Sequence, residues 1–350
     1  MKNRSGEIRL VALCALCVAL FLYGTYQYCF ENSAENPLPI TFSTPNTPKA
    51  VVQSDEPKTT SAATESTVKK TTSETETKSV ATAAKGKVKG KVIGKFYSPY
   101  TANTSYNGIY LKNSSGLKVD LKKLVTADLP YKIEKNDQPQ VLIIHTHTTE
   151  SFLPETRDYY TDKDEVRTLN EKANVVALGN IMTDKLNAAG IKTVHDTTVH
   201  DYPAYNGSYD RAAETIKKNL KKYPSIKIVI DLHRDAIAGD GSNRIKPIAE
   251  INGKTAAQVM LVMGSQSGGI TAFPKWQENL KLAVRFQQKM ESMYPGLARS
   301  ISLMSRLYNE NLTTGSLLLE VGTEVNSMEE VSYSAELAAN ALISVLNGAQ

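Results

Sequence analysis

Three apolar runs of this chain each end in side chains that can bind a metal or move protons. The run 141–144 leads into the sequence HTHTTE, the run 226–232 leads into His233, and the run that begins at Ser316 contains Glu320. Within HTHTTE the reactive groups are His145, His147 and Glu150. All three cysteines lie in the first 30 residues, so a metal bound further along would take its ligands from His and carboxylate side chains.

Two histidines and one glutamate are a common zinc ligand set that leaves a position open for water. Zinc lowers the pKa of that water to about 7 and polarises a carbonyl oxygen. A second carboxylate must then carry a proton to the leaving amine. Glu320 suits this task because burial in an apolar run raises a carboxyl pKa. Glu171, in the first predicted turn of the following helix, is the candidate third ligand.

Each of these residues also has a purely structural interpretation. His145 could be a packed histidine at a strand end, and it shares a face with His147 only if the strand continues past residue 144. Glu171 could be the acid of a capping box, and Glu320 could pair with Arg244. The pattern H-x-H is weak evidence by itself, and the sequence contains no HExxH.

Four further polar residues stay secondary candidates. His195 and His200 lie on a connection, and we interpret them as surface residues. Asp231 and Asp235 flank His233, where they could orient ligands or cap loops. The sequence does not separate these two roles.

The elements that position these groups alternate between strands and helices. The predicted strands are Val141–Ile144, Ile191–Val194, Ile226–Leu232 and Ser316–Gly322, and a hairpin is predicted around Asn252-Gly253. The predicted helices are Glu171–Ala189, 210–222, 277–293 and Met328–Leu346. This alternation predicts an α/β fold with a mostly parallel central sheet flanked by helices. The carboxyl ends of parallel strands share one edge, so the reactive groups should meet there.

The N-terminal region predicts a membrane anchor. Residues 10–30 are uncharged and long enough to span a bilayer, after a cytoplasmic tail of residues 1–9. The competing interpretation is a cleaved signal peptide. We expect residues 31–95, including the run KGKVKGKVIGK, to be a disordered linker. The net charge of +5 is mild, and no basic stripe suggests nucleic-acid binding.

The remaining chain divides into an N-terminal extension, residues 96–139, and a catalytic domain, residues 140–350. Over about residues 96–350, the sequences VLIIHTHTTESF, DLHRDA, YPGLARSI and YNENLTTGSLLLEVGTEVNSMEE resemble the stage II sporulation protein P family. That family is similar in turn to zinc-dependent N-acetylmuramoyl-L-alanine amidases. The resemblance implies an amidase-like fold in a single-pass membrane protein whose C-terminal domain lies outside the cytoplasm.

The implied activity is peptidoglycan hydrolysis during forespore engulfment. The bond cut would be the amide between N-acetylmuramic acid and L-Ala, and the family is also associated with cleavage of peptide cross-links. The implied partners, in the mother-cell membrane, are the stage II sporulation proteins D and M. A membrane-tethered wall-binding scaffold with a vestigial site is the alternative.

The resemblance also implies roles for individual residues. His147, Glu171 and His233 match the ligands of Zn²⁺, and Glu320 matches the catalytic glutamate. His145 stands where the amidases have a Gly-rich loop, so its role as ligand, transition-state stabiliser or supporting group stays open. Weak candidates for substrate contact are Arg244, Trp276, Asn279 and Asn309.

Overall fold

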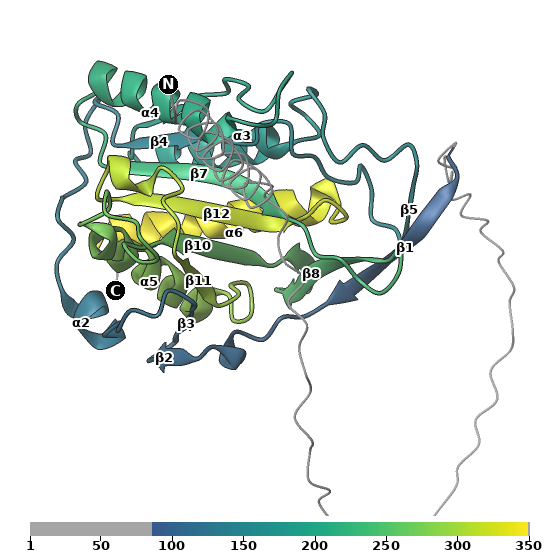
Figure 1. Cartoon of the computed structure of the whole chain (residues 1–350), viewed down its shortest axis with the longest axis horizontal. Coiled ribbons are helices and arrows are strands. Elements are labelled where there is room, and N and C mark those ends of the chain that lie inside the picture. Colours follow the sequence, from purple (N-terminus) through teal and green to yellow (C-terminus); the bar gives the residue numbers. More distant parts are fainter. Residues whose placement is uncertain (1–85, 349–350) are drawn as a thin grey trace, which may run out of the picture. The chain divides into compact units, whose positions relative to one another are not determined.

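The structure of the protein, a computed structural model, describes residues 86–348 (Figure 1). The chain divides into two units, Met1–Thr77 and Lys78–Gln350, and every described residue belongs to the second. The predicted cytoplasmic tail, the span 10–30 and most of the predicted linker lie outside the described residues. Between residues 86 and 348, no helix combines the length and the apolar character needed to cross a bilayer.

A mixed sheet of eight strands forms the centre of this unit (Figure 1). Its strands are, in spatial order, β2 (Thr104–Tyr106), β3 (Ile109–Asn113), β11 (Ile301–Met304), β10 (Val259–Gly264), β12 (Ser316–Thr323), β7 (Ile228–Asp235), β4 (Val141–Ile144) and β6 (Thr193–His195). Strands β12, β7, β4 and β6 are parallel neighbours, whereas β10 runs antiparallel to β12. The predicted α/β class is confirmed, and the ends of β4, β7 and β12 do share one edge.

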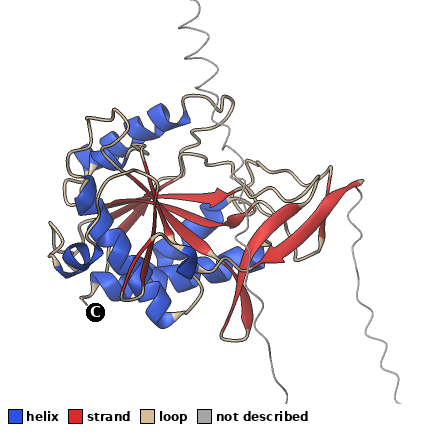
Figure 2. Cartoon of the chain, turned by 60° about the horizontal axis from the view of Figure 1, so that its bottom comes forward, coloured by secondary structure: helices blue, strands red, loops and turns tan. Residues whose placement is uncertain are grey.

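Helices cover both faces of the sheet (Figure 2). They are α2 (Leu121–Thr126), α3 (Val175–Ala188), α4 (Ser208–Lys222), α5 (Trp276–Met293) and α6 (Met328–Leu346), with single 3₁₀ turns η1 (Pro99–Thr101) and η2 (Glu310–Leu312). Helix α4 packs through Ile216 on the face that carries Leu142 and Ile144. Helices α3, α5 and α6 pack on the opposite face, which carries Val141 and Ile143. Successive strand residues therefore point to opposite helical layers.

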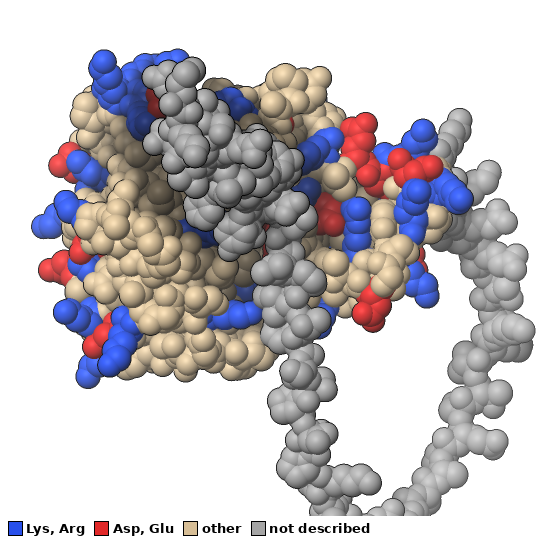
Figure 3. All heavy atoms as spheres, in the orientation of Figure 1, with Lys and Arg blue, Asp and Glu red and all other residues tan. Residues whose placement is uncertain are grey.

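A second sheet of four strands forms an arm beside the first. Its order is β5 (Tyr159–Thr161), β1 (Val88–Lys95), β8 (Arg244–Ile251) and β9 (Lys254–Ala257). The run KGKVKGKVIGK was expected in the linker, but residues 88–95 are β1, which pairs with both β5 and β8. Basic and acidic side chains are mixed on the arm (Figure 3). The predicted hairpin around Asn252-Gly253 is confirmed as β8–β9, and β10 leaves it to join the main sheet.

One other prediction about local structure is wrong. Helix α3 begins at Val175 rather than Glu171, because Asn174 accepts the Val176 N–H at 3.0 Å and so caps the helix. The segment 96–139, predicted as an extension of the catalytic domain, packs on the main unit: β2 and β3 extend the sheet and α2 packs against α5.

Candidate active site

Successive side chains of β7 point to opposite faces of the sheet, and this alternation decides which polar side chains lie together. Ile228, Ile230 and Leu232 belong to the core cluster under α3, α5 and α6. Asp231 and His233 alternate with them and so face the α4 side of the sheet. On the neighbouring parallel strand Glu320 stands in register with His233. A basic and an acidic group therefore lie side by side on one face.

His147 reaches the same place from the turn after β4. Its ring lies edge-to-face with that of His233, with centroids 5.3 Å apart. Tyr205 stacks on it at 4.6 Å, and the Tyr205 hydroxyl lies 3.1 Å from His147 Nε2. His147 Nδ1 is buried and has no hydrogen-bonding partner. The imidazole is thus fixed through one nitrogen while the other stays available as a donor atom.

Glu150, three residues further along the same turn, completes the group. Its Oε2 lies 3.4 Å from His233 Nδ1 and accepts a hydrogen bond from the Arg234 N–H at 3.1 Å. The guanidinium of Arg167 lies 3.7 Å from its other oxygen. Glu150 is only 5% exposed, so these contacts hold a buried carboxylate against the histidine.

Asp231 holds the far side of His233. Its Oδ1 lies 2.9 Å from His233 Nε2. The same carboxylate accepts hydrogen bonds from the Thr146 N–H at 2.7 Å and the Thr146 hydroxyl at 2.6 Å. The two ends of β4 and β7 are tied together by these contacts, which fixes the imidazole between two acids.

The protonation of the group follows from burial and charge. Burial lowers the pKa of His147 to about 4, so it is neutral at pH 7. Burial opposes the charge of Glu150, but Arg234 and His233 outweigh it and lower the pKa of Glu150 to about 2. Burial also opposes the charge of His233, and the two acids Asp231 and Glu150 overcome it and raise its pKa well above the ordinary value. A protonated imidazole therefore offsets one of the two negative charges of Asp231 and Glu150.

Glu320 differs from the other acids of the site. Its side chain is partly exposed, but its Oε2 is buried and has no hydrogen-bonding partner. Burial raises its pKa to about 8, with a smaller opposing effect of His233 and further increases from Asp235 and Glu150. Its carboxyl group can therefore take and release a proton near neutral pH.

His145 lies on the opposite face of the sheet. Strand β4 ends at Ile144, so His145 and His147 do not share a face. The Nδ1–H of His145 donates to the Leu232 carbonyl at 2.9 Å, and its Nε2 lies 2.8 Å from His195 Nε2. Both nitrogens are occupied, and a Cβ on Gly179 of α3 would lie 2.9 Å from His145 Nε2. His145 was left open as a ligand, a transition-state stabiliser or a supporting group. Its contacts in the structure are those of a supporting group.

Glu171 does not join the group. It is exposed in the turn before α3, and within the described part of the chain its carboxylate contacts neither histidine. Glu150, rather than Glu171, is the glutamate that lies beside His233. The sequence placed Glu150 among the strand-end groups, and its position three residues after His147 in one turn was the signal for it.

Other secondary candidates are also corrected. His200 is buried, not a surface residue, and bonds the His145 carbonyl at 2.7 Å and the Thr215 hydroxyl at 2.8 Å. His195 is packed against His145 as described above. Arg244 pairs with Glu324 at 3.4 Å and not with Glu320.

The four weak candidates for substrate contact lie in different parts of the fold. Arg244 lies on the arm over the Tyr160 ring, and Trp276 is in the core. Asn279 is fully buried and donates to the Glu310 carbonyl at 2.7 Å. Only Asn309 touches the site, through a 2.8 Å hydrogen bond from its Nδ2 to the Tyr209 carbonyl.

Sequence reasoning missed the side chains that surround His147. Arg167 lies over the Tyr205 ring at 4.6 Å and pairs with Asp201. Asp201 also accepts the Thr149 N–H at 3.1 Å, so this chain of contacts anchors the turn that carries His147. These residues come from loops distant in sequence, and no spacing in the chain signals them.

The donor set fits zinc in its chemistry. Between residues 86 and 348, the side chains of His, Cys, Asp and Glu form no group of three or more that could hold a metal. However, in the tautomer in which His147 Nε2–H donates to the Tyr205 hydroxyl, the buried Nδ1 is unprotonated, which is the form that binds metal. Two ligand atoms on one tetrahedral zinc are about 3.3–3.5 Å apart. His233 Nδ1 and Glu150 Oε2 lie 3.4 Å apart.

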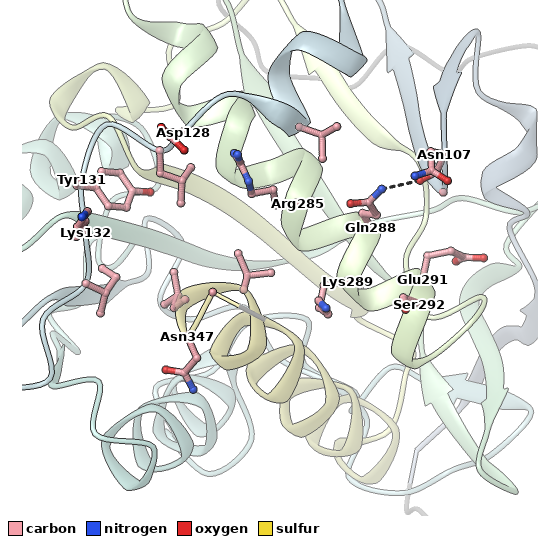
Figure 4. Close-up of a pocket in the computed structure, with 17 residues that line it drawn as sticks. Asn107, Asp128, Tyr131, Lys132, Arg285, Gln288, Lys289, Glu291, Ser292 and Asn347 are labelled. Atoms are coloured by element: carbon pink, nitrogen blue, oxygen red, sulfur yellow. Dashed lines mark hydrogen bonds between the residues drawn. The ribbon is translucent and has the colours of Figure 1, made fainter. Parts of the chain in front are cut away.

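Two cavities among the described residues lie away from this group. The larger, of about 740 Å³, is lined by the segment after α2, by α5 and by the end of α6 (Figure 4). A second, of about 640 Å³, lies beside the residues that precede β7 and β12. Neither is lined by His147, Glu150, His233 or Glu320. The candidate site is therefore identified by its side chains and not by a cavity.

A mixed α/β sheet with two histidines and three carboxylates side by side on one face is an architecture suited to a hydrolase. A family model described as Stage II sporulation protein P (SpoIIP) matches residues 24–343, and the chain belongs to this family. The stage II sporulation protein P of Bacillus subtilis (strain 168) is 34% identical over 223 residues, which are 60% of this chain. The match covers 52% of that relative, so this chain aligns with about half its length.

Solved structures with a similar arrangement include two bacterial amidases. An N-acetylmuramoyl-L-alanine amidase of Nostoc punctiforme has a TM-score of 0.35 and 11% identity, covering 59% of this chain and 97% of that one. An N-acetylmuramoyl-L-alanine amidase of Clostridium difficile 630 has a TM-score of 0.36 and 14% identity. The match covers 61% of this chain and 97% of that one.

Proposed function

We propose that the chain is a sporulation peptidoglycan hydrolase, a zinc-dependent N-acetylmuramoyl-L-alanine amidase. The observation that carries the proposal is the group formed by His147, Glu150 and His233 beside Glu320. It combines a zinc-type donor set with a carboxyl group whose pKa lies near neutrality. Membership of the SpoIIP family supports sporulation as the setting and peptidoglycan as the substrate.

His147, Glu150 and His233 would hold the zinc ion. When bound, zinc supplies Lewis-acid activation of water and of an amide carbonyl. Asp231 and Tyr205 keep the two imidazoles oriented from behind. A proton must leave His233 before it becomes a ligand, so metal affinity should fall at low pH.

Glu320 performs the proton transfers. Its carboxylate takes a proton from the attacking water as the water oxygen bonds to the amide carbon. It then returns the proton to the departing nitrogen as the C–N bond breaks. The products are the carboxylate of the lactyl group and the free amine of L-Ala.

The setting is proposed from the sequence. We place the chain in the mother-cell membrane, held by the span 10–30, with stage II sporulation proteins D and M as partners during engulfment. The domain of residues 140–350 would then act on peptidoglycan outside the cytoplasm. Cleavage of peptide cross-links is a second activity to be tested on the same site.

The deciding experiment is digestion of purified peptidoglycan by the purified full-length chain, with zinc and after chelation. Mass spectrometry of the released fragments identifies the bond. Free stem peptides and peptide-free glycans that require zinc establish the amidase. Cross-link cleavage alone would replace it with an endopeptidase. Binding without any cleavage would favour a wall-binding scaffold with a vestigial site.

A further inference from the structure

Tyr209 stands over the candidate site and has no part in the mechanism above. It lies in the first turn of α4, on the face of the sheet that carries Asp231 and His233. Its ring meets His147 edge-to-face with centroids 5.7 Å apart. Its other neighbour is the Tyr308 ring, at 6.1 Å. The side chain is therefore packed between His147 and Tyr308, beside the candidate site.

The surroundings of the hydroxyl place it among the acids of the site. Burial raises the pKa of Tyr209, and the charges of Asp231, Glu320 and Glu150 raise it further. These acids come from three segments, and all of them act on the same phenol. A phenol is protonated at neutral pH, so the hydroxyl can donate a hydrogen bond.

A strained turn fixes the backbone of Tyr209. Tyr308 and Asn309 both have left-handed backbone conformations, with φ of 49° and 56°. Asn309 Nδ2 donates to the Tyr209 carbonyl at 2.8 Å. The next residue, Glu310, is buried and accepts the Gly264 N–H at 2.8 Å, which anchors the turn to the sheet. Two consecutive non-glycine residues in this conformation cost free energy, and such strain clusters where geometry matters for function.

We propose that the Tyr209 hydroxyl is a catalytic donor that binds the carbonyl oxygen of the amide being cut. This rests on the proposed amidase function. As the water oxygen bonds to the carbonyl carbon, the π electron pair moves onto the carbonyl oxygen. The phenol hydrogen bond stabilises the negative charge that develops there, and the phenol keeps its proton. When the C–N bond breaks, the pair returns to the carbonyl and Glu320 delivers the proton to nitrogen.

The acids of the site make a hydrogen-bond donor at the carbonyl oxygen useful. Glu150, Asp231 and Glu320 surround the reaction and oppose an oxyanion. The Arg234 side chain is turned toward the Val166 carbonyl, which it contacts at 2.9 Å. A fixed phenol adds a donor without adding a titrating group.

The test compares Tyr209→Phe with wild type in the full-length zinc-loaded chain, using a soluble muropeptide as substrate. Phenylalanine keeps the ring packing on His147 and Tyr308 and removes only the hydroxyl. We expect kcat to fall roughly 100-fold with KM unchanged. Zinc content and zinc affinity should equal those of wild type. Tyr223→Phe, at the far end of α4, is the matched control and should keep wild-type kinetics.

Three outcomes would overturn the proposal. An unchanged kcat in Tyr209→Phe, with an active wild type, removes Tyr209 from catalysis and leaves the amidase function standing. A loss of zinc in Tyr209→Phe would show that the tyrosine acts only by supporting His147. An inactive wild type that binds zinc and muropeptide would refute the amidase function itself, and the role of Tyr209 with it.

Discussion

Replacing Glu320 by glutamine should abolish turnover and at the same time stabilise the metal-free protein at alkaline pH. Glutamine has the same shape as glutamate but carries no charge and binds no proton. Glu320 is held beside His233 with its Oε2 buried and without a hydrogen-bonding partner. Its negative charge is therefore poorly solvated in the folded protein and well solvated in the unfolded chain.

The magnitude and sign follow from proton linkage. In the folded protein burial raises the pKa of Glu320 to about 8 from 4.5. Between these pH values the folded state holds a proton that the unfolded chain has lost, so stability falls as pH rises. The full difference corresponds to about 5 kcal/mol above pH 8. Because the side chain is partly exposed, solvent reduces this, and we expect about 2 kcal/mol.

The assay is urea and thermal unfolding of wild type and Glu320→Gln in the presence of a chelator, at pH 8.5 and pH 4.5. At pH 8.5 the variant should be more stable by about 2 kcal/mol, or roughly 4–8 °C in Tm for a domain of this size. At pH 4.5 the two should coincide. Glu214→Gln, on the exposed surface of α4, is the control and should change stability by less than about 0.5 kcal/mol at either pH.

Activity is measured on the same samples after zinc is added. Turnover should fall by roughly 10²–10⁴-fold in Glu320→Gln while zinc content is unchanged. An equal or lower stability of the variant at pH 8.5, or a difference that does not depend on pH, would refute the argument that Glu320 is a poorly solvated carboxyl group. Unchanged turnover would refute its role as the base.

Three other predictions test the surroundings of the site. Glu150→Gln should weaken zinc binding by more than about 100-fold in calorimetry, whereas Glu171→Gln should leave it unchanged, because Glu150 contacts His233 and Glu171 does not. Gly179→Ala should destabilise the protein by roughly 1–3 kcal/mol in urea unfolding, because its Cβ would overlap His195 Nε2. Burial lowers the pKa of His145 to about 3, so its neutral form contributes stability above pH 6.5 that is lost as pH falls toward 3. The urea midpoint should follow that loss.

Controls make these outcomes specific. Adding His195→Ala to Gly179→Ala should restore part of the lost stability, and no recovery would mean that the overlap is not the cause. His145→Asn should flatten the acid dependence of the urea midpoint. If that variant keeps the acid dependence of wild type, groups other than His145 cause the dependence. Equal zinc affinity in Glu150→Gln and wild type would show that Glu150 is not the third ligand.

The sequence predicted the fold where the patterns were long and regular. Val141–Ile144 and Met328–Leu346 were predicted at their observed bounds, because an apolar β-branched run and a long helical pattern each favour one structure. The start of α3 was misplaced because Thr168 and Glu171 have the spacing of a capping box, whereas Asn174 is the residue next to the apolar run. Strand β1 was missed because its Lys-Gly pattern is poor in apolar residues, and its pairing with β5 and β8 supplies what the local sequence lacks.

The site could be predicted in its strand residues but not in its loop residues. His233 and Glu320 are fixed by position along buried strands, where spacing alone decides which face they occupy. Glu150 is fixed instead by the bend of the turn after β4, and that bend depends on Asp201 and Arg167 from two other loops. No local pattern encodes such a contact. Spacing alone therefore favoured Glu171, whereas the tertiary contacts bring Glu150 and not Glu171 beside His233.

His145 and His147 are separated by one residue in the sequence, but the turn after β4 places them on opposite faces of the sheet. The strand alternation sends His145 to the layer of α3, where a glycine makes room for it against His195. The chain then turns, and Thr146 bonds Asp231, which also holds His233. His147 follows on the opposite face with its Nδ1 unpartnered. The first histidine thus anchors the start of the turn from behind the sheet, and only the second can reach a metal in front of it.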